Sequence, residues 1–507
     1  MKARVAKDIL LIGHSFIYLA ALVSLYWQIP GMKYLSFCGL DSEFHGCRFI
    51  PESVEFIKRL YGEKGLVPVA SKLSCDRLSC RSFRNGINIL PLVTNFFCIA
   101  PSYALQVIVL FGIALDSISI MSELARNAIT YLVLFIIYST AIQVGDVFLW
   151  FQWDTLLIES GAICILIAPL PFVGSSPADN VSLYLMRWLL FRLMYSSGVV
   201  KLTSHCPLWW DLAATKGMFP RFQRLVTYLG TAMSAVLITS TLYFFIRCFN
   251  IGIDGFKIVS SIAFSKQQFE EFVEESTVWL LYIGVIGFTT EVIAATVRMT
   301  GLYGRPEVIV EGSYEPNGPW IMFEFYSKPG RLDERPRFVL PHQPRLDWQM
   351  WFAALGSYQN NPFFLSLIYH LLRNNSEVTY LMKKYPFEAK LPNFIRANLY
   401  LYHYTNFNEK SGWTKDYWRR DFQEEYMPSV TREDTGLSNY LHRNGFVLEE
   451  QFRLQNQDFA LESKLQTLHN FVRTLNPTTF VDSVILAHAV LFIVYMKFKQ
   501  LTFVTVQ

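Results

Sequence analysis

Hydrophobic residues are gathered along this chain into long stretches with few charges. Stretches about as long as a bilayer is thick lie near residues 9 to 27, 103 to 121, 128 to 147, 155 to 173, 183 to 202, 226 to 246, 278 to 297 and 480 to 498. An α-helix rises about 1.5 Å per residue, so about 20 apolar residues cross the hydrocarbon core. The pattern therefore predicts an α-helical polytopic membrane protein with about 6 to 8 transmembrane helices, and not a soluble enzyme.

The segment from 300 to 479 is polar and contains no spanning stretch. Trp320 to Tyr326 and Phe394 to Tyr404 have the composition of strands, and apolar residues alternate with more polar ones in the second. Trp348 to Leu355 and Pro362 to Arg373 are predicted to be helices. We therefore expect a β-rich α+β domain in water.

These patterns divide the chain into three parts. Residues 1 to 299 are expected to form a transmembrane helical bundle with a long loop at 28 to 100. Residues 300 to 479 form the soluble domain, and residues 480 to 507 form a C-terminal transmembrane helix with a short tail.

Positive charges at the two ends of the chain predict its orientation. Lys2, Arg4 and Lys7 precede the first hydrophobic stretch, and Lys497 and Lys499 follow the last. Positive residues favour the cytoplasmic side, so both termini are expected there and the soluble domain on the opposite, lumenal side. The lumenal sequon Asn374-Asn375-Ser376 is then a candidate N-glycosylation site, whereas Asn180 is expected to stay unmodified in a cytoplasmic loop.

Composition and motifs argue against several classes of function. The chain is 52% hydrophobic and 17% charged, and its net charge of +4 leaves no footprint for nucleic acid. No GxSxG, Walker, HExxH or GxGxxG motif occurs, so no catalytic residue, cofactor site or metal site is predicted. Cys75 and Cys80 lie in a polar loop, where they form a candidate disulfide with each other or with Cys38 and Cys47, or else remain free thiols.

Charged residues inside the apolar stretches need partners. Arg192 lies near the middle of the stretch from 183 to 202, and a charge at that depth is expensive unless it is paired. Glu159 and Asp154 are the available acidic partners, with Glu159 preferred. Either such a pair fixes the packing of helices, which we favour, or these residues form a polar functional site inside the bundle.

Several long runs of residues resemble the lipase maturation factor family. They are FQWDTLLIESG from Phe151, RWLLFRLMYSSGVVKLTS from Arg187, GPWIMFEFYSKPG from Gly318, PRFVLPHQPRLDWQMWFAALGSYQNNPFF from Pro336 and PNFIRANLYLYHYT from Pro392. The resemblance extends over about residues 60 to 410. Three features depart from it: an apparent insertion at 32 to 59, a shortened region after Trp210, and the part beyond 410.

The resemblance implies a multi-pass protein of the endoplasmic reticulum membrane that is required for the folding, assembly and maturation of secreted lipases. Its expected action is chaperone-like binding, so it is not expected to be an enzyme. Its partners would be nascent secreted lipases and the lipid bilayer, and the oligomeric state, including a homo-oligomer, stays open. The candidate client-binding residues are the aromatic residues Trp320, Phe323, Phe325, Trp348, Trp351 and Tyr400.

Two other functions stay open on the sequence alone. The segment from Arg187 to Lys201 loosely resembles the vitamin K-dependent carboxylase class, which implies a membrane-embedded enzyme or a protein that binds a lipidic cofactor. A transporter is a third hypothesis, with Glu159 and Arg192 along its path. It is the weakest, because no pair of broken helices appears in corresponding halves.

Overall fold

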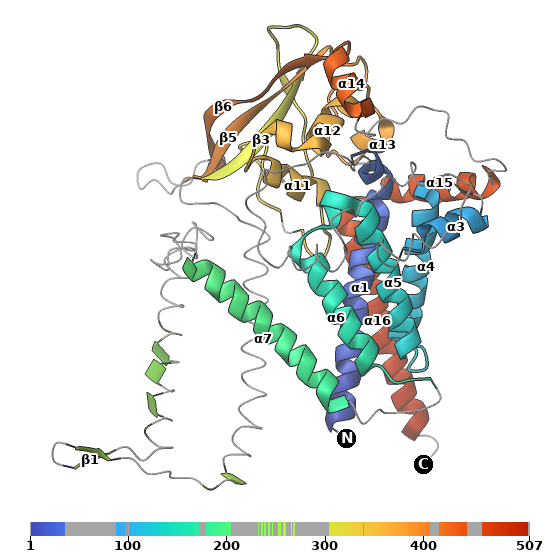
Figure 1. Ribbon diagram of the computed structural model, residues 1–507, viewed down its shortest axis with the longest axis vertical. Coiled ribbons are helices and arrows are strands. Elements are labelled where there is room, and N and C mark those ends of the chain that lie inside the picture. The colour runs from blue at the N-terminus through green and yellow to red at the C-terminus, as the bar shows by residue number, and fades with distance from the viewer. Residues whose placement is uncertain are drawn as a thin grey trace.

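The protein combines a bundle of long helices with a small antiparallel sheet domain at one end of the bundle (Figure 1). The structure, a computed structural model, describes residues 2–35, 88–97, 99, 101–171, 179–203, short pieces between 232 and 268, 304–337, 339–405, 415–443 and 459–504. The predicted stretches at 226 to 246 and 278 to 297 lie mostly outside these residues, as do Cys75 and Cys80.

Within the described residues, four helices are long and apolar enough to cross a membrane. They belong to α1 (Lys2–Leu35), α4 (Pro101–Met121), α5 (Ala128–Gly145) and α16 (Pro477–Val504). α1 packs closely on α4, where Gly112 leaves room for the side chain of Leu22. A methyl group at Gly112 would come within 3.0 Å of the Leu22 Cδ1 atom.

Two further predicted stretches form helices that are less typical of a membrane span. α6 (Gln152–Ile167) has 16 residues and packs on α5, while α7 (Asp179–Thr203) has 25 residues and contacts α6. α7 leans away from the other helices (Figure 1). A 3-10 turn, η2 (Asp146–Leu149), joins α5 to α6.

Two shorter helices lie where the bundle meets the sheet domain. α3 (Leu90–Phe97) precedes α4, and α15 (Phe459–Arg473) precedes α16. α15 runs across the direction of the long helices (Figure 1).

The sheet has the strand order β4-β3-β5-β6 and is antiparallel throughout. Its strands are β3 (Arg305–Ser313), β4 (Ile321–Met322), β5 (Phe394–Tyr404) and β6 (Trp418–Thr431). Four helices accompany it: α11 (Arg345–Ala353), α12 (Pro362–Leu372), α13 (Ser376–Thr379) and α14 (Thr435–Arg443). A separate hairpin pairs β1 (Gly252–Asp254) with β2 (Lys257–Val259).

One face of the sheet packs on α12 to form the core of this domain. Val308, Val310, Ile395 and Ala397 of the sheet share a buried cluster with the apolar face of α12, including Phe364. Burying these side chains supplies the main driving force for the domain. The predicted strand at 394 to 404 and the two predicted helices are confirmed, but the alternation along β5 changes after Ala397. Tyr402 lies on the opposite face of the sheet, where it is buried with Ile309 and Trp418 and donates its hydroxyl to the Gly330 carbonyl.

The predicted strand from Trp320 to Tyr326 is too long. Only Ile321 and Met322 pair with β3, and after Phe323 the chain leaves β3. Glu324 instead exchanges backbone hydrogen bonds with Lys384. Phe323 and Phe325 are still buried in the core, but the backbone of Glu324 is hydrogen-bonded to Lys384 and not to β3.

Both chain termini lie at one end of the bundle and the sheet at the other (Figure 1). This arrangement has the same sense as the predicted orientation, in which both termini share one side of the membrane. The last turns of α1 continue into the sheet domain, where they contact α12 and α13. The bundle and the sheet domain therefore share a packed interface through α1.

Candidate functional site at the junction of the two domains

The junction between bundle and sheet domain is built around the first turns of α6 and α11. Phe151 precedes α6 in an extended conformation, and Asp154 lies in the first turn of the helix. Pro344 precedes α11, so Arg345 is the first helical residue. A carboxylate is favoured at a helix N-terminus, where backbone N–H groups are unpaired, which suits Asp154 to its position.

Arg345 and Asp154 form a buried ion pair between these helices. The two terminal guanidinium nitrogens of Arg345 donate to the two carboxylate oxygens of Asp154, the Nη2–Oδ1 distance being 2.7 Å. Both side chains are almost completely buried, with 1% and 0% of their surface exposed. Tyr138 of α5 donates its hydroxyl to Asp154 Oδ1 at 2.5 Å, and Arg345 Nη1 donates to the Phe148 carbonyl at 3.1 Å.

The helix α1 completes this network from a third direction. The Gln28 amide accepts a hydrogen bond from the backbone N–H of Arg345 at 2.9 Å and donates to the Gln343 carbonyl at 2.8 Å. One turn earlier, Ser24 Oγ is 3.0 Å from His342 Nδ1 and accepts from the backbone N–H of Gln343 at 2.9 Å. Residues from α1, α5, α6 and the segment before α11 thus meet in one polar network.

Aromatic rings surround the network. Phe151 and Trp153 stack at 4.8 Å, and Trp348 meets both of them edge-on at 5.5 and 4.7 Å. On the α1 side, Trp27 packs edge-on against Tyr326 and Tyr380, and Tyr380 donates its hydroxyl to the Trp27 carbonyl at 2.9 Å. The rings exclude water, which makes each hydrogen bond inside the network harder to replace.

The chemistry of this junction is structural. Burial, assisted by the nearby Arg345 guanidinium, lowers the pKa of His342 to about 3, so this imidazole is neutral and serves as a hydrogen-bond partner. Burial raises the pKa of Asp347, on the same helix as Arg345, to about 6 even though its carboxylate accepts the Ser327 and Lys328 N–H groups. Among the described residues, no group of three His, Cys, Asp or Glu side chains could hold a metal ion. The arrangement can fix the sheet domain on the bundle.

The structure places the predicted intramembrane charges in two separate pairs. Arg192 of α7 forms an ion pair with Glu159 of α6. Asp154, the second candidate partner for Arg192, is bound by Arg345 instead. Asp154 binds Arg345 because it lies in the first turn of α6, at the end of this helix next to the sheet domain.

The six candidate client-binding residues do not form one surface. Phe323 and Phe325 are 2% and 5% exposed and belong to the core, which corrects the prediction for these two residues. Trp348 and Trp351 are half-buried on α11, with Trp348 in the aromatic ring around the junction. Trp348 packs the two domains together through Phe151 and Trp153, whereas Trp351 contacts Phe352 of its own helix. Trp320 and Tyr400 are half-buried and lie beneath the guanidinium groups of Arg396 and Arg420.

The candidate glycosylation residue, Asn374, lies in the sheet domain. Asn374 is half-buried in the turn between α12 and α13, with a backbone φ of 50° in the left-handed region that asparagine tolerates. Two histidines of this domain also have partners: His370 Nδ1 lies 3.1 Å from the Asn375 amide. His403 pairs with Asp421 at 3.3 Å.

Sequence reasoning missed Arg345, Gln28 and Ser24. Arg345 stands in the run PRLDWQMW, in which Trp348 and Trp351 are the predicted site residues, and Gln28 lies just beyond the first hydrophobic stretch, at the start of the predicted loop. The available signal was an arginine at the start of one helix and an aspartate at the start of another. Their separation of 191 positions gives no local pattern that would connect them.

Comparison with known proteins agrees with the two-part architecture. Residues 50–223 match the lipase maturation factor transmembrane domain, and residues 293–428 match the lipase maturation factor C-terminal domain. The chain is 27% identical to lipase maturation factor 2 of Xenopus tropicalis, over 95% of this chain and 90% of that protein. It is 26% identical to lipase maturation factor 2 of Homo sapiens, over 94% and 89%, and 24% identical to lipase maturation factor 1 of Bos taurus, over 74% and 85%.

The alignment with the Xenopus tropicalis protein extends over 669 positions, more than the 507 residues of this chain, so that relative contains segments without a counterpart here. No solved structure matches this chain. The two matched domains follow each other in the same order as the helix bundle and the sheet domain of the structure, and the similarity extends along most of the chain. This protein therefore belongs to the lipase maturation factor family.

Proposed function

We propose that this protein is a lipase maturation factor of the endoplasmic reticulum membrane that acts as a chaperone-like binder of secreted lipases and not as an enzyme. The names of its relatives support a role in lipase maturation. The sheet domain, which makes up most of the predicted soluble part at 300 to 479, is the proposed client-binding part on the lumenal side. The observation that carries this proposal is the outer face of the sheet, which is the face opposite α12.

This outer face carries a row of aromatic and arginine side chains. Arg396 lies over the ring of Trp320 at 4.2 Å, and Arg420 lies over the ring of Tyr400 at 4.5 Å. Phe422, paired with Tyr400 across β5 and β6, is 5.7 Å from it and 59% exposed. Tryptophan, tyrosine and arginine dominate the binding energy of protein interfaces, because they combine a large contact area with hydrogen-bonding groups.

The edge of the sheet adds main-chain groups to this surface. β6 has 14 residues and pairs, within the described part of the chain, on its β5 side alone. An exposed edge can add a strand from a partly folded client. Charged residues along β6, such as Arg419 and Glu424, oppose pairing with unrelated strands. The surface therefore suits a client that has both an open strand and apolar side chains.

Two neighbouring substitutions on β6 test this proposal. In cells that lack the protein and produce a secreted lipase, Phe422→Ala is expected to lower the specific activity of the secreted lipase, with the amount of the variant in the membrane unchanged. Gln423→Ala, at the next position of β6, which is also exposed, is the control and should keep full activity. A photoreactive residue at position 422 should crosslink to nascent lipase. Full lipase activity with Phe422→Ala together with no crosslink from 422 would overturn the proposal.

A lipidic cofactor inside the bundle is the second candidate function, and one observation favours it. His14 and Tyr18 of α1 lie beside Asp116 of α4 in a fully buried cluster. His14 Nε2, the Tyr18 hydroxyl and Asp116 Oδ2 have no hydrogen-bond partner among the described residues. Stoichiometric copurification of a quinone-like lipid that is lost in Asp116→Asn would favour this function over client binding alone.

A further inference from the structure

The helix α15 has three distinct sides. Leu465, His469 and Val472 are buried against the rest of the protein, and the His469 ring packs edge-on against Tyr26 and Tyr380. The polar side carries Ser463, Gln466, Thr467, Asn470 and Arg473. The third side is apolar and open, with Leu468 43% exposed, Phe471 65% exposed and Leu475, just beyond the helix, 38% exposed.

Two tethers fix the height of α15 relative to the membrane-spanning helices. The Tyr103 hydroxyl, at the first residue of the span in α4, donates to Gln466 Oε1 at 2.8 Å. At its other end, α15 leads through a short turn directly into α16, whose span begins at Pro477. Trp27 Nε1 of α1 donates to the Leu475 carbonyl in this turn at 3.3 Å. The helix therefore lies where spans begin, at the boundary of the hydrocarbon.

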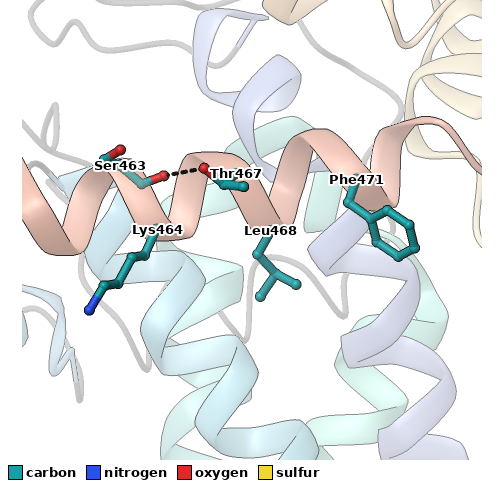
Figure 2. Close-up of a pocket in the computed structure, with 5 residues that line it drawn as sticks. All are labelled: Ser463, Lys464, Thr467, Leu468 and Phe471. Atoms are coloured by element: carbon teal, nitrogen blue, oxygen red, sulfur yellow. Dashed lines mark hydrogen bonds between the residues drawn. The ribbon is translucent and has the colours of Figure 1, made fainter.

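The open apolar side of α15 points along the bundle. Figure 2 shows Leu468 and Phe471 projecting from α15 to the side on which the long helices continue, with Lys464 beside them, and together with Ser463 and Thr467 they line an open groove. The short helix α3 packs on the same helix α4 and exposes Leu92 and Phe96, at 58% and 81%. The apolar surface of the spans is thus continued by two helices at their boundary.

We propose that α15 is an in-plane helix that lies on the leaflet at the sheet-domain side, with Leu468, Phe471 and Leu475 inserted among the lipid acyl chains below the headgroups. A helix with an apolar flank, a polar flank and a lysine near the end of the apolar flank is suited to this position. Lys464 can extend its ammonium group to the lipid phosphates while its methylenes remain in apolar surroundings. α15 is also bound to α13, because Arg473 donates to the Ser376 carbonyl at 2.7 Å. Insertion of α15 into the leaflet would therefore set the sheet domain at a fixed height above the lipid.

Photocrosslinking from opposite flanks of α15 tests the proposal. The photoreactive amino acid p-benzoyl-phenylalanine is placed singly at positions 468, 471 and 475 of the full-length protein, and at the exposed polar positions 467 and 470 as matched controls. Each variant is irradiated in phosphatidylcholine vesicles and in the membranes of the producing cells. Phospholipid adducts are expected at 468, 471 and 475 and not at 467 and 470.

Three apolar positions keep the test decisive if one variant fails to fold. Lipid adducts of equal yield on both flanks, or no lipid adduct at any of the three apolar positions, would overturn the proposal. Adducts to a second protein or to another copy of this chain at 471, in place of lipid, would overturn it as well. None of these outcomes depends on lipase activity, so the result is separate from the proposed client binding.

Discussion

Arg345 holds Asp154 with both of its terminal guanidinium nitrogens, although the two residues are 191 positions apart and belong to different parts of the protein. The pair is buried, and the Tyr138 hydroxyl, the Phe148 carbonyl and the Gln343 side-chain oxygen form further hydrogen bonds with it. A buried charge that loses its partner is strongly destabilising, whereas replacing both partners costs much less. The pair therefore acts mainly to fix the sheet domain on the bundle in one orientation.

We expect Arg345→Leu to destabilise the protein by about 3 to 5 kcal/mol, because Asp154 is left charged and unpaired in the interior. Asp154→Asn added to Arg345→Leu should recover part of this loss. The measurement is thermal unfolding of the detergent-solubilised protein. Arg337→Leu, which removes an exposed ion pair with Glu334, is the control and should change stability little. If the double variant unfolds as easily as Arg345→Leu, the lone carboxylate is not the cause.

We expect Arg192→Leu to destabilise the folded protein by on the order of a few kcal/mol, because Glu159 is then left unpaired beside lipid. The amount of folded protein in the membrane should fall as a result. Arg192→Leu combined with Glu159→Gln should restore expression. Arg192→Leu combined with Asp154→Asn should not, because Asp154 is bound by Arg345. Expression in membranes distinguishes these variants. If Arg192→Leu combined with Glu159→Gln is expressed no better than Arg192→Leu alone, Arg192 belongs to a polar site and not to a simple ion pair.

Gly161→Ala is expected to disturb the contact between α1 and α6. A Cβ atom at Gly161 would lie 2.2 Å from the Tyr18 hydroxyl, which is fully buried and has nowhere to move without displacing its neighbours. Overpacking of this kind typically costs about 1 to 3 kcal/mol. Removing the hydroxyl with Tyr18→Phe should relieve it. The measurement is thermal unfolding of Gly161→Ala with and without Tyr18→Phe. If both variants lose the same stability, the Tyr18 hydroxyl is not the group that the new methyl group meets.

The buried carboxyl of Asp347 should make stability fall as pH rises. Its pKa is raised in the folded protein to about 6 by burial, so the folded state binds the proton more tightly than the unfolded chain does, and the contribution is lost between about pH 4 and pH 6. Relative to Asp347→Asn, the unmodified protein should lose on the order of 3 kcal/mol across this window. His342, whose pKa is lowered, acts with the opposite sign, but its effect is common to both proteins and cancels in the comparison. Parallel pH profiles of the two proteins would contradict this expectation.

Asn374 is expected to carry the glycan if the sheet domain lies in the lumen. Asn374→Gln should abolish the shift in electrophoretic mobility that glycosidase treatment causes, whereas Asn180→Gln should leave it unchanged. Asn180 lies at the start of α7, at the end of the bundle that holds both termini (Figure 1). A shift that persists in Asn374→Gln and disappears in Asn180→Gln would reverse the orientation.

The sequence alone determined the features that depend on local pattern. Runs of about 20 apolar residues predicted the membrane helices, since only a helix satisfies its own backbone in lipid. The alternation in Phe394 to Tyr404 predicted β5, and the resemblance of long motifs pointed to the family that the domain matches show. These inferences need no knowledge of which segments meet.

The tertiary structure decided which residues are partners and which apolar side chains remain at the surface. Phe323 and Phe325 look in sequence like Trp320 and Tyr400, but two of them fill the core and two lie on the outer face of the sheet. Asp154 is near Glu159 in sequence, yet it binds Arg345 while Glu159 binds Arg192. Burial and ion pairing depend on distances between segments that are remote in the chain, and these distances exist only once the helices and the sheet have packed together.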